Sequence, residues 1–124
     1  MTGKVRKVLL VDDEASFTRL VKLSLETTGS YEVRVVHEGT QAFACAREFR
    51  PDLILLDFVI PDMDGREVAS QFEADEELKK IPIVFLTGFP LSKMKVERPF
   101  LCKPLTPEEI HDFIQGFLSE NPSP

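Results

Sequence analysis

Short apolar runs alternate with segments of helical period along this chain. The runs that are almost wholly apolar span residues 7–11, 53–56 and 83–86. Such runs are typical of strands buried on both faces of a parallel sheet, so we predict that they form its centre. Residues 31–37 mix three valines with Glu32 and Arg34, which predicts a strand nearer an edge, with one side facing solvent. A short fifth run spans residues 100–102.

Apolar side chains recur at helical spacing between these predicted strands. The first face comprises Phe17, Leu20, Val21 and Leu25, the second Ala42, Cys45, Ala46 and Phe49, and the third Val68 and Phe72. Asp62 and Asp64 are predicted to start the third of these helices, and Gly65 allows the turn.

The last helix has the clearest signals. Thr106 can cap it, Pro107 suits its first position, and Glu109 suits its third. Its apolar stripe comprises Ile110, Phe113, Ile114, Phe117 and Leu118. This helix is therefore predicted to close the domain.

The alternation of strands and helices predicts a single α/β domain. The chain has 124 residues, of which 43% are hydrophobic, and this is enough for a core of its own. We expect a doubly wound parallel sheet with helices on both faces over residues 4–119. Residues 120–124 read Glu-Asn-Pro-Ser-Pro and are expected to form a tail or the start of a linker.

The composition excludes several classes of partner. The formal net charge is −6, and an acidic surface repels phosphodiester backbones and anionic lipids, so binding to nucleic acid or membranes is not expected.

Cys45 and Cys102 form no C-x-x-C pair and have apolar neighbours, so both are expected in the core as reduced thiols. No apolar run approaches the roughly 18 residues that a membrane span needs, and we expect a cytoplasmic protein.

Polar residues stand where the predicted strands end. Asp12 and Asp13 follow the first strand, Asp57 ends the third, Thr87 the fourth and Lys103 the fifth. Because the carboxyl ends of parallel strands meet at one edge, where doubly wound folds bind ligands, these five residues should converge. Asp12 and Asp13 could also cap the first helix, and the two roles are compatible.

The chemistry of such a set is specific. Three carboxylates in one crevice repel one another, so they need a cation between them. Oxygen ligands suit Mg²⁺, which takes carboxylates, waters and a phosphoryl oxygen. A lysine ammonium and a threonine hydroxyl opposite the cation would hold the remaining phosphoryl oxygens. The set predicts a site that places a phosphoryl group on a carboxylate.

These residues closely resemble the response-regulator receiver family of two-component signalling. The matching motifs are Val11-Asp12-Asp13-Glu14, Gly39 with Ala42, Pro51-Asp52-Leu53-Ile54-Leu55-Leu56-Asp57, Pro61-Asp62-Met63-Asp64-Gly65, Thr87-Gly88 and Lys103-Pro104. Each motif is weak alone, but together they occur in the right order and span nearly the whole chain. The resemblance implies a flavodoxin-like, five-stranded sheet in the order 2-1-3-4-5.

The resemblance also implies a phosphoacceptor and its metal ligands. Asp57 would accept the phosphoryl group, and Asp13 would bind Mg²⁺ or Mn²⁺ directly. Asp12 would be an outer or water-mediated ligand, and the backbone carbonyl of Val59 would complete the set. Thr87 and Lys103 would contact the phosphoryl group.

A signalling role follows from the same resemblance. The phosphoryl group would come from a sensor histidine kinase or a phosphotransfer protein. Phosphorylation would draw Thr87 inward and Phe100 with it, and the Lys103–Pro104 bond is expected to be cis. Such a domain is a switch that promotes its own phosphorylation and dephosphorylation, and it signals to an effector domain or a partner protein. The oligomeric state stays open.

The segment between Thr87 and Lys103 departs from the family. Only 15 residues separate the two, which is shorter than usual by more than a helical turn, and Pro90 and Pro99 lie among them. At about 1.5 Å per residue, what remains between the strands builds no more than roughly two turns. We therefore predict that the fourth helix is shortened or missing.

Other functions fit the residues less well. An EF-hand with Gly65 at its sixth position would need carboxylates where Ile60 and Gln71 stand. A phosphatase of the haloacid dehalogenase type needs a second aspartate two residues after the nucleophile, where this chain has Val59. The first loop of a flavodoxin cradles a phosphate, which Asp12 and Asp13 would repel. A receiver-like protein that only binds partners is the remaining alternative.

Overall fold

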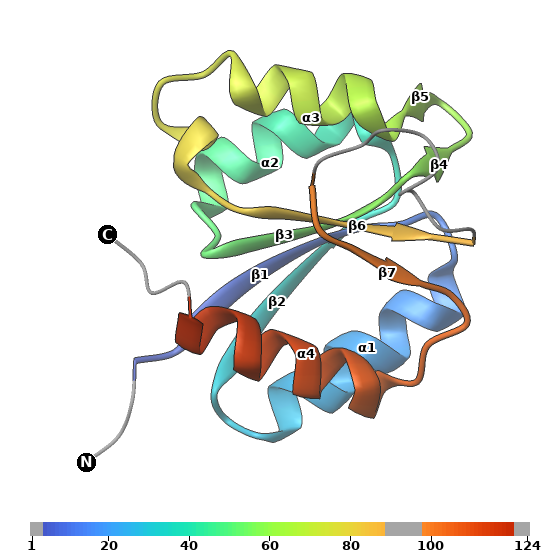
Figure 1. Ribbon diagram of the computed structural model, residues 1–124, viewed down its shortest axis with the longest axis vertical. Coiled ribbons are helices and arrows are strands. Elements are labelled where there is room, and N and C mark those ends of the chain that lie inside the picture. Colours follow the sequence, from blue (N-terminus) through green and yellow to red (C-terminus); the bar gives the residue numbers. More distant parts are fainter. Residues whose placement is uncertain (1–3, 89–97, 121–124) are drawn as a thin grey trace.

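The fold is a three-layer α/β/α arrangement, seen in a computed structural model that describes residues 4–88 and 98–120 (Figure 1). The described residues form a five-stranded parallel sheet in the order β2-β1-β3-β6-β7. Its strands are β1 (Arg6–Val11), β2 (Tyr31–Val36), β3 (Leu53–Asp57), β6 (Ile83–Thr87) and β7 (Phe100–Cys102). Because β6 and β7 are the fourth and fifth strands of this sheet, the predicted order 2-1-3-4-5 is confirmed. Residues 89–97, on which the prediction of a shortened or missing fourth helix falls, lie outside the described residues.

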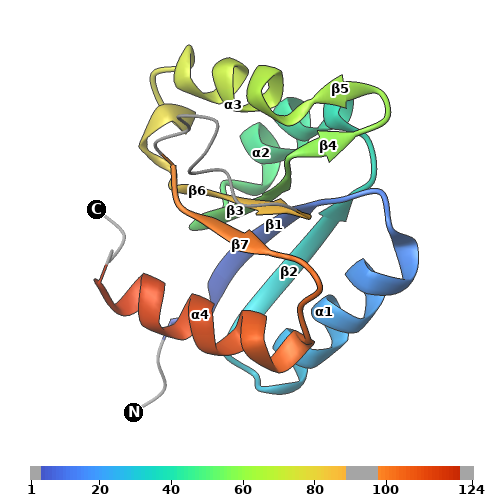
Figure 2. The ribbon, with the colours of Figure 1, turned by 45° about the vertical axis from the view of Figure 1, so that its right-hand side comes forward.

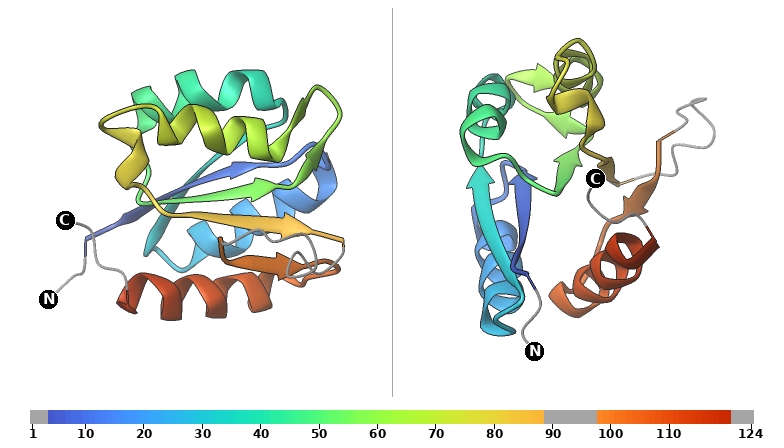
Figure 3. Two further views of the ribbon diagram at one scale, coloured as in Figure 1. Left: turned by 45° about the horizontal axis from the view of Figure 1, so that its top comes forward. Right: turned by 90° about the vertical axis from the view of Figure 1, so that its left-hand side faces the viewer.

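Helices cover both faces of the sheet. They are α1 (Ala15–Thr27), α2 (Ala42–Phe49), α3 (Gly65–Glu73) and α4 (Pro107–Glu120), with short 3-10 turns η1 (Gly39–Gln41) and η2 (Leu78–Lys80). Figure 3 shows α2 and α3 on one face and α1 and α4 on the other. A small antiparallel hairpin, β4 (Val59–Ile60) with β5 (Met63–Asp64), leads from β3 into α3 (Figure 2). In the described ranges, no helix is long and apolar enough to cross a membrane.

The central strands are buried as their apolar sequences predict. Every residue of β3 and β6 is buried, whereas β2 at the edge buries only Val33 and Val36. Side chains of successive strand residues point to opposite faces, so the sheet separates two cores. One core lies under α2 and α3 and includes Phe72 and Phe85, and the other lies under α1 and α4 and includes Leu25 and Ile114.

The start of α4 has the predicted capping pattern. The Thr106 backbone N–H donates to Glu109 Oε1 at 2.9 Å, and the Glu109 N–H donates to Thr106 Oγ1 at 3.1 Å. This reciprocal pair satisfies two backbone donors that the first helical turn leaves without a partner inside the helix.

Three predictions about single residues were wrong. Leu20 was expected on the buried face of its helix but is 56% exposed, because it lies about 100° around α1 from the fully buried Val21. Cys102 was expected in the core but is exposed on the edge strand β7, whereas Cys45, also expected in the core, is half-buried against it. Asp62 was expected to help start α3, and only Asp64 caps that helix, through a 2.7 Å hydrogen bond from the Arg66 N–H.

Asp62 holds a different turn. Its carboxylate accepts hydrogen bonds from the backbone N–H groups of Gly39 and Thr40 and from the Thr40 hydroxyl, at 2.9, 3.1 and 3.0 Å. These bonds lower the pKa of Asp62 below its usual value. The residue therefore ties the β4–β5 hairpin to η1 at the start of α2.

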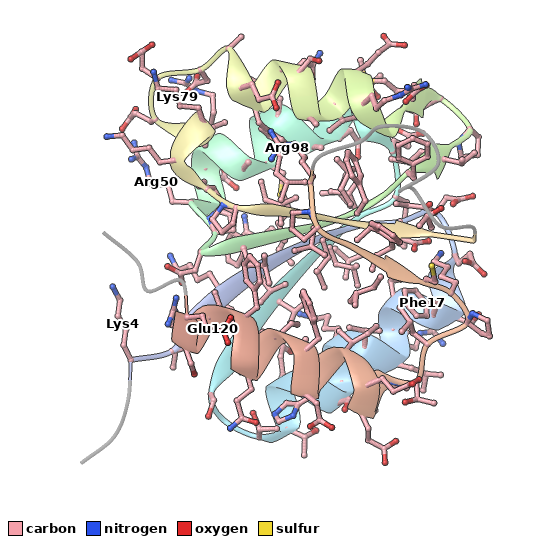
Figure 4. The ribbon with its side chains drawn as sticks, viewed as in Figure 1. Lys4, Phe17, Arg50, Lys79, Arg98 and Glu120 are labelled. Atoms are coloured by element: carbon pink, nitrogen blue, oxygen red, sulfur yellow. The ribbon has the colours of Figure 1, made fainter. Side chains whose placement is uncertain are left out.

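All five strands point the same way, so their carboxyl ends lie together at one edge of the sheet (Figures 1 and 3). Lys4 and Glu120 lie at the opposite side of the molecule (Figure 4). The carboxyl edge is where the predicted site residues stand.

Candidate functional site

Three carboxylates meet where β1 and β3 end. Asp12 and Asp13 follow β1, Asp57 ends β3, and their carboxylate oxygens lie within 4.8 Å of one another. Asp12 is fully buried and Asp57 is 7% exposed, while Asp13 is exposed. Oxygen atoms so grouped, one of them open to solvent, fit a hard divalent cation such as Mg²⁺.

Both carboxylate oxygens of Asp12 already accept hydrogen bonds. The backbone N–H of Glu14 donates to Oδ1 at 2.9 Å, and Lys103 Nζ donates to Oδ2 at 2.7 Å. Asp12 thus fixes the turn before α1 and is not itself the helix cap, since Glu14 occupies that position without a side-chain capping bond. An Asp12 with both oxygens engaged suits a metal contact through water.

The carboxyl group of Asp57 is less acidic than that of a free aspartate side chain. Burial, followed by the charge of Asp12, raises the pKa of Asp57 from 3.8 to about 6. The backbone N–H of Val59, which donates to Asp57 Oδ1 at 3.1 Å, and the ammonium of Lys103 limit the rise. The carboxyl is therefore mostly ionised at neutral pH.

Lys103 places its positively charged ammonium group among these carboxylates. Its Nζ lies 2.7 Å from Asp12 Oδ2, 2.6 Å from Glu14 Oε1 and 3.6 Å from Asp57 Oδ2. It also lies 4.9 Å from the centre of the Phe17 ring, and Figure 4 shows Phe17 on α1 beside the end of β7. Burial opposes the charge of Lys103, but the hydrogen bonds to the carboxylates outweigh it and raise its pKa. The Lys103–Pro104 peptide bond is cis, as the resemblance implied.

Thr87 lies on β6, the strand next to β3, and Phe100 lies on β7, the edge strand beyond β6. Thr87, at the end of β6, is 2% exposed, and its backbone carbonyl accepts a 2.7 Å hydrogen bond from the Lys103 N–H. On β7, Phe100 pairs with Phe85 in register, and Cys102 pairs with Thr87. Phe100 is partly buried against the core under α2 and α3.

Gly65 allows the hairpin to fold closely over the end of β3. Its N–H donates to the carbonyl of Phe58 at 3.0 Å. A Cβ atom on Gly65 would lie 2.7 Å from that carbonyl oxygen and 2.8 Å from the carbonyl oxygen of Asp57. The hairpin carries Val59, whose side chain is 64% exposed next to Asp57. A glycine here therefore sets the backbone path around Asp57.

The sequence and the fold match a known family. Residues 8–115 match the model described as the response regulator receiver domain. This chain belongs to that family. The receiver domain is 33% identical over 122 residues to the DNA-binding response regulator MtrA of Mycobacterium tuberculosis, an alignment that covers 94% of this chain and 52% of the relative. The chain thus spans about half the length of that curated relative.

Solved structures have the same fold as this receiver domain. The chemotaxis response regulator CheY4 of Vibrio cholerae superimposes with a TM-score of 0.83 at 31% identity, covering 91% of this chain and 98% of that one. The receiver domain of the sensor histidine kinase PA1611 of Pseudomonas aeruginosa gives 0.80 at 27% identity, covering 93% and 98%, and was solved with a magnesium ion coordinated in its active site cleft.

Sequence reasoning missed two residues that touch the site of this receiver domain. Glu14 was noted only as one of the acidic residues after the first strand, and Phe17 only as a core residue, yet both contact Lys103. The glutamate directly after the acid pair was the available signal. Its contact with a lysine 89 positions away depends on the packing of β7 beside α1, which no local pattern reveals.

Proposed function

We propose that Asp57 accepts a phosphoryl group from the phosphohistidine of a sensor histidine kinase or of a phosphotransfer protein. The domain then acts as a switch that signals to an attached effector domain or to a partner protein. The observation that carries this proposal is the convergence of three carboxylates and Lys103 at the carboxyl edge of the sheet.

The transfer forms one bond and breaks one. An Asp57 carboxylate oxygen attacks phosphorus in line with the leaving group, the new P–O bond forms, and the bond from phosphorus to the donor breaks. The donor leaves with the electron pair of that bond. Since the pKa of Asp57 is about 6, the nucleophile is ionised at neutral pH without a separate base. Lys103 stands close enough to bind the oxygens of the incoming group.

Asp13, Asp57 and the Val59 carbonyl would hold a Mg²⁺ or Mn²⁺ ion directly, and Asp12 would hold it through water. A bound divalent cation offsets the negative charge of the phosphoryl oxygens. The grouping of the carboxylate oxygens supports this assignment, as does the magnesium ion in the PA1611 receiver domain.

Thr87 and Phe100 are the proposed switch. Thr87 would bind a phosphoryl oxygen, and Phe100 would move as the threonine moves. The support is their placement, because Thr87 ends the strand next to Asp57, Phe100 lies on the strand paired with it, and Lys103 is tied to the Thr87 backbone. MtrA is described as DNA-binding, and a DNA-binding effector is one form that the output could take. The acidic receiver domain itself would not contact nucleic acid.

Intact-mass measurement tests the proposal. Incubation with acetyl phosphate and Mg²⁺ should add one phosphoryl group that hydroxylamine removes, as expected of an acyl phosphate. Asp57→Ala should add none, and removal of Mg²⁺ with a chelator should suppress the addition in the wild type. An unchanged wild-type mass under saturating donor and Mg²⁺ would favour a receiver-like protein that only binds partners.

A further inference from the structure

Glu14 takes part in the site without belonging to the acceptor or to the group of three aspartates. Its carboxylate Oε1 lies 2.6 Å from Lys103 Nζ, whereas Asp57 Oδ2 lies 3.6 Å from the same nitrogen. The shorter contact is with a glutamate whose side chain is 58% exposed, while the Lys103 side chain is only 18% exposed. The ammonium thus lies between Glu14 and the buried Asp12, 2.7 Å from Asp12 Oδ2, and closer to both than to the acceptor.

The backbone of α1 holds Glu14 in this position. Glu14 is the N-cap residue, its carbonyl accepts the first helical hydrogen bond from the Thr18 N–H at 3.0 Å, and its own N–H is bound to Asp12. Its side chain makes no capping bond, so the carboxylate is available to Lys103. The Phe17 ring, one turn further along α1, lies beside the same ammonium. Both contacts come from the first turn of one helix.

We propose that Glu14 is a positioning residue that competes with the phosphoryl group for Lys103 and thereby slows phosphorylation of Asp57. This inference rests on the proposed function and deepens it. The Glu14 contact takes one of the three N–H donors of Lys103 and part of its charge, so part of the interaction energy of the lysine opposes the transfer. Glu14 touches no reacting atom and acts through Lys103 alone.

Three variants separate this role from a general effect of charge. Glu14→Gln removes the charge with little change of shape, and Glu14→Asp keeps the charge but withdraws the carboxylate by one methylene group. Glu108→Gln is the matched control, because it removes one acidic charge from the first turn of α4 and Glu108 is not among the carboxylates that contact Lys103. None of the three replaces the acceptor or a proposed metal ligand, and the Glu14 substitutions keep the backbone N–H that binds Asp12.

The rate of phosphorylation by acetyl phosphate in Mg²⁺ is the main readout. In this reaction the acetate oxygen leaves with the electron pair of its bond to phosphorus, and no proton is transferred. Glu14→Gln and Glu14→Asp should both react faster than the wild type, by about two- to fivefold, which is the range for an ion pair with one exposed partner. Glu108→Gln should react at the wild-type rate.

A double-variant cycle shows whether the effect passes through Lys103. In a Lys103→Met background, adding Glu14→Gln should leave the remaining slow rate unchanged. A second readout needs no phosphorylation: the side-chain ammonium resonance of Lys103 in nitrogen-15 NMR should shift in Glu14→Gln and stay in place in Glu108→Gln.

The possible failures are distinguishable. If the wild type is phosphorylated and both Glu14 variants react at its rate, this inference is overturned and the proposed function stands. If Glu14→Gln and Glu108→Gln accelerate equally, or if the acceleration persists without Lys103, the effect is one of general charge and the inference is again wrong. If no protein is phosphorylated, the proposed function fails and this inference fails with it.

Discussion

At the scale of single residues, Asp57 combines two conflicting requirements. As the proposed phosphoacceptor, Asp57 must be ionised to attack, but its burial disfavours the charge. Burial and the charge of Asp12 raise the pKa of the Asp57 carboxyl to about 6. The Val59 N–H and the Lys103 ammonium keep the pKa from rising further. Without a cation in the cluster, the ionised form is therefore a source of instability in the folded protein.

This balance predicts how stability depends on pH in Asp57→Asn. The pKa of Asp57 is about 6 in the folded protein and near 3.8 in the unfolded chain. Between about pH 4 and pH 6, the folded protein therefore keeps a proton on Asp57 that the unfolded chain has lost. The stability that this proton contributes is fully present below pH 4 and is lost as the pH rises through 6. Asparagine carries no charge at any of these pH values, so the variant does not lose this stability. Discounted for solvent screening, the variant should gain on the order of 1 to 2 kcal/mol over the wild type above pH 7.

Urea denaturation of both proteins from pH 4 to pH 8 in the presence of a chelator measures this difference. The gain should grow between pH 4 and pH 6.5 and then level off. Asp75→Asn is the contrasting case, since backbone hydrogen bonds lower the pKa of Asp75 and its removal should be harmful above pH 4. A gap between wild type and Asp57→Asn that is constant with pH would contradict the assigned environment of Asp57.

At the scale of elements, the β4–β5 hairpin and the start of α3 determine how the backbone passes Asp57. The hairpin is tied to α2 by the bonds from η1 to Asp62, and to the end of β3 by the close approach of Gly65. The atoms that a Cβ on Gly65 would meet belong to the backbone, so no side-chain movement can relieve the contact. Gly116 in α4 is the opposite case, because a Cβ there meets nothing within 4 Å.

The two glycines should respond to alanine with opposite signs. Gly65→Ala should lower the free energy of unfolding by about 1 to 3 kcal/mol, because the new methyl group forces the hairpin away from β3. Gly116→Ala should raise it by about 1 kcal/mol, because alanine favours the helical backbone and has room. Urea denaturation at pH 7 measures both. Equal stability of Gly65→Ala and the wild type would mean that the hairpin does not press against the end of β3.

At the scale of the whole molecule, the site joins strands that are far apart in the sequence. β1, β3, β6 and β7 each contribute a residue at or just beyond their carboxyl ends, and Lys103 links the last of these strands to the first. A cation held among Asp12, Asp13 and Asp57 would relieve their mutual repulsion in the folded state only. Binding at the site is therefore coupled to the stability of the entire sheet.

Mg²⁺ should accordingly stabilise the fold. At a concentration one hundred times the dissociation constant, the gain should be about 2.7 kcal/mol, which corresponds to a rise in Tm of roughly 10 °C for a domain of this size. Asp13→Asn should lose most of the rise, while its exposed position leaves folding intact. Asp112→Asn, an exposed acid on α4, should keep the full rise. Thermal melts with Mg²⁺ and with a chelator decide the matter, and an equal rise in all three proteins would place the cation elsewhere.

The sheet order was predicted through the resemblance to the receiver family. The amino-acid sequence by itself determined the burial of the central strands, the capping box of α4 and the placement of Asp12, Asp13, Asp57 and Lys103 at one edge. These features depend on local patterns, since apolar runs bury strands, periodicity orients helices and parallel topology gathers the strand ends. Only the tertiary structure decided that Asp62 binds the turn at η1, that Leu20 and Cys102 face outward, and that Glu14 takes the ammonium of Lys103. Each of these outcomes depends on which surface or side chain a neighbouring element presents, and residues distant in sequence meet only when the layers pack.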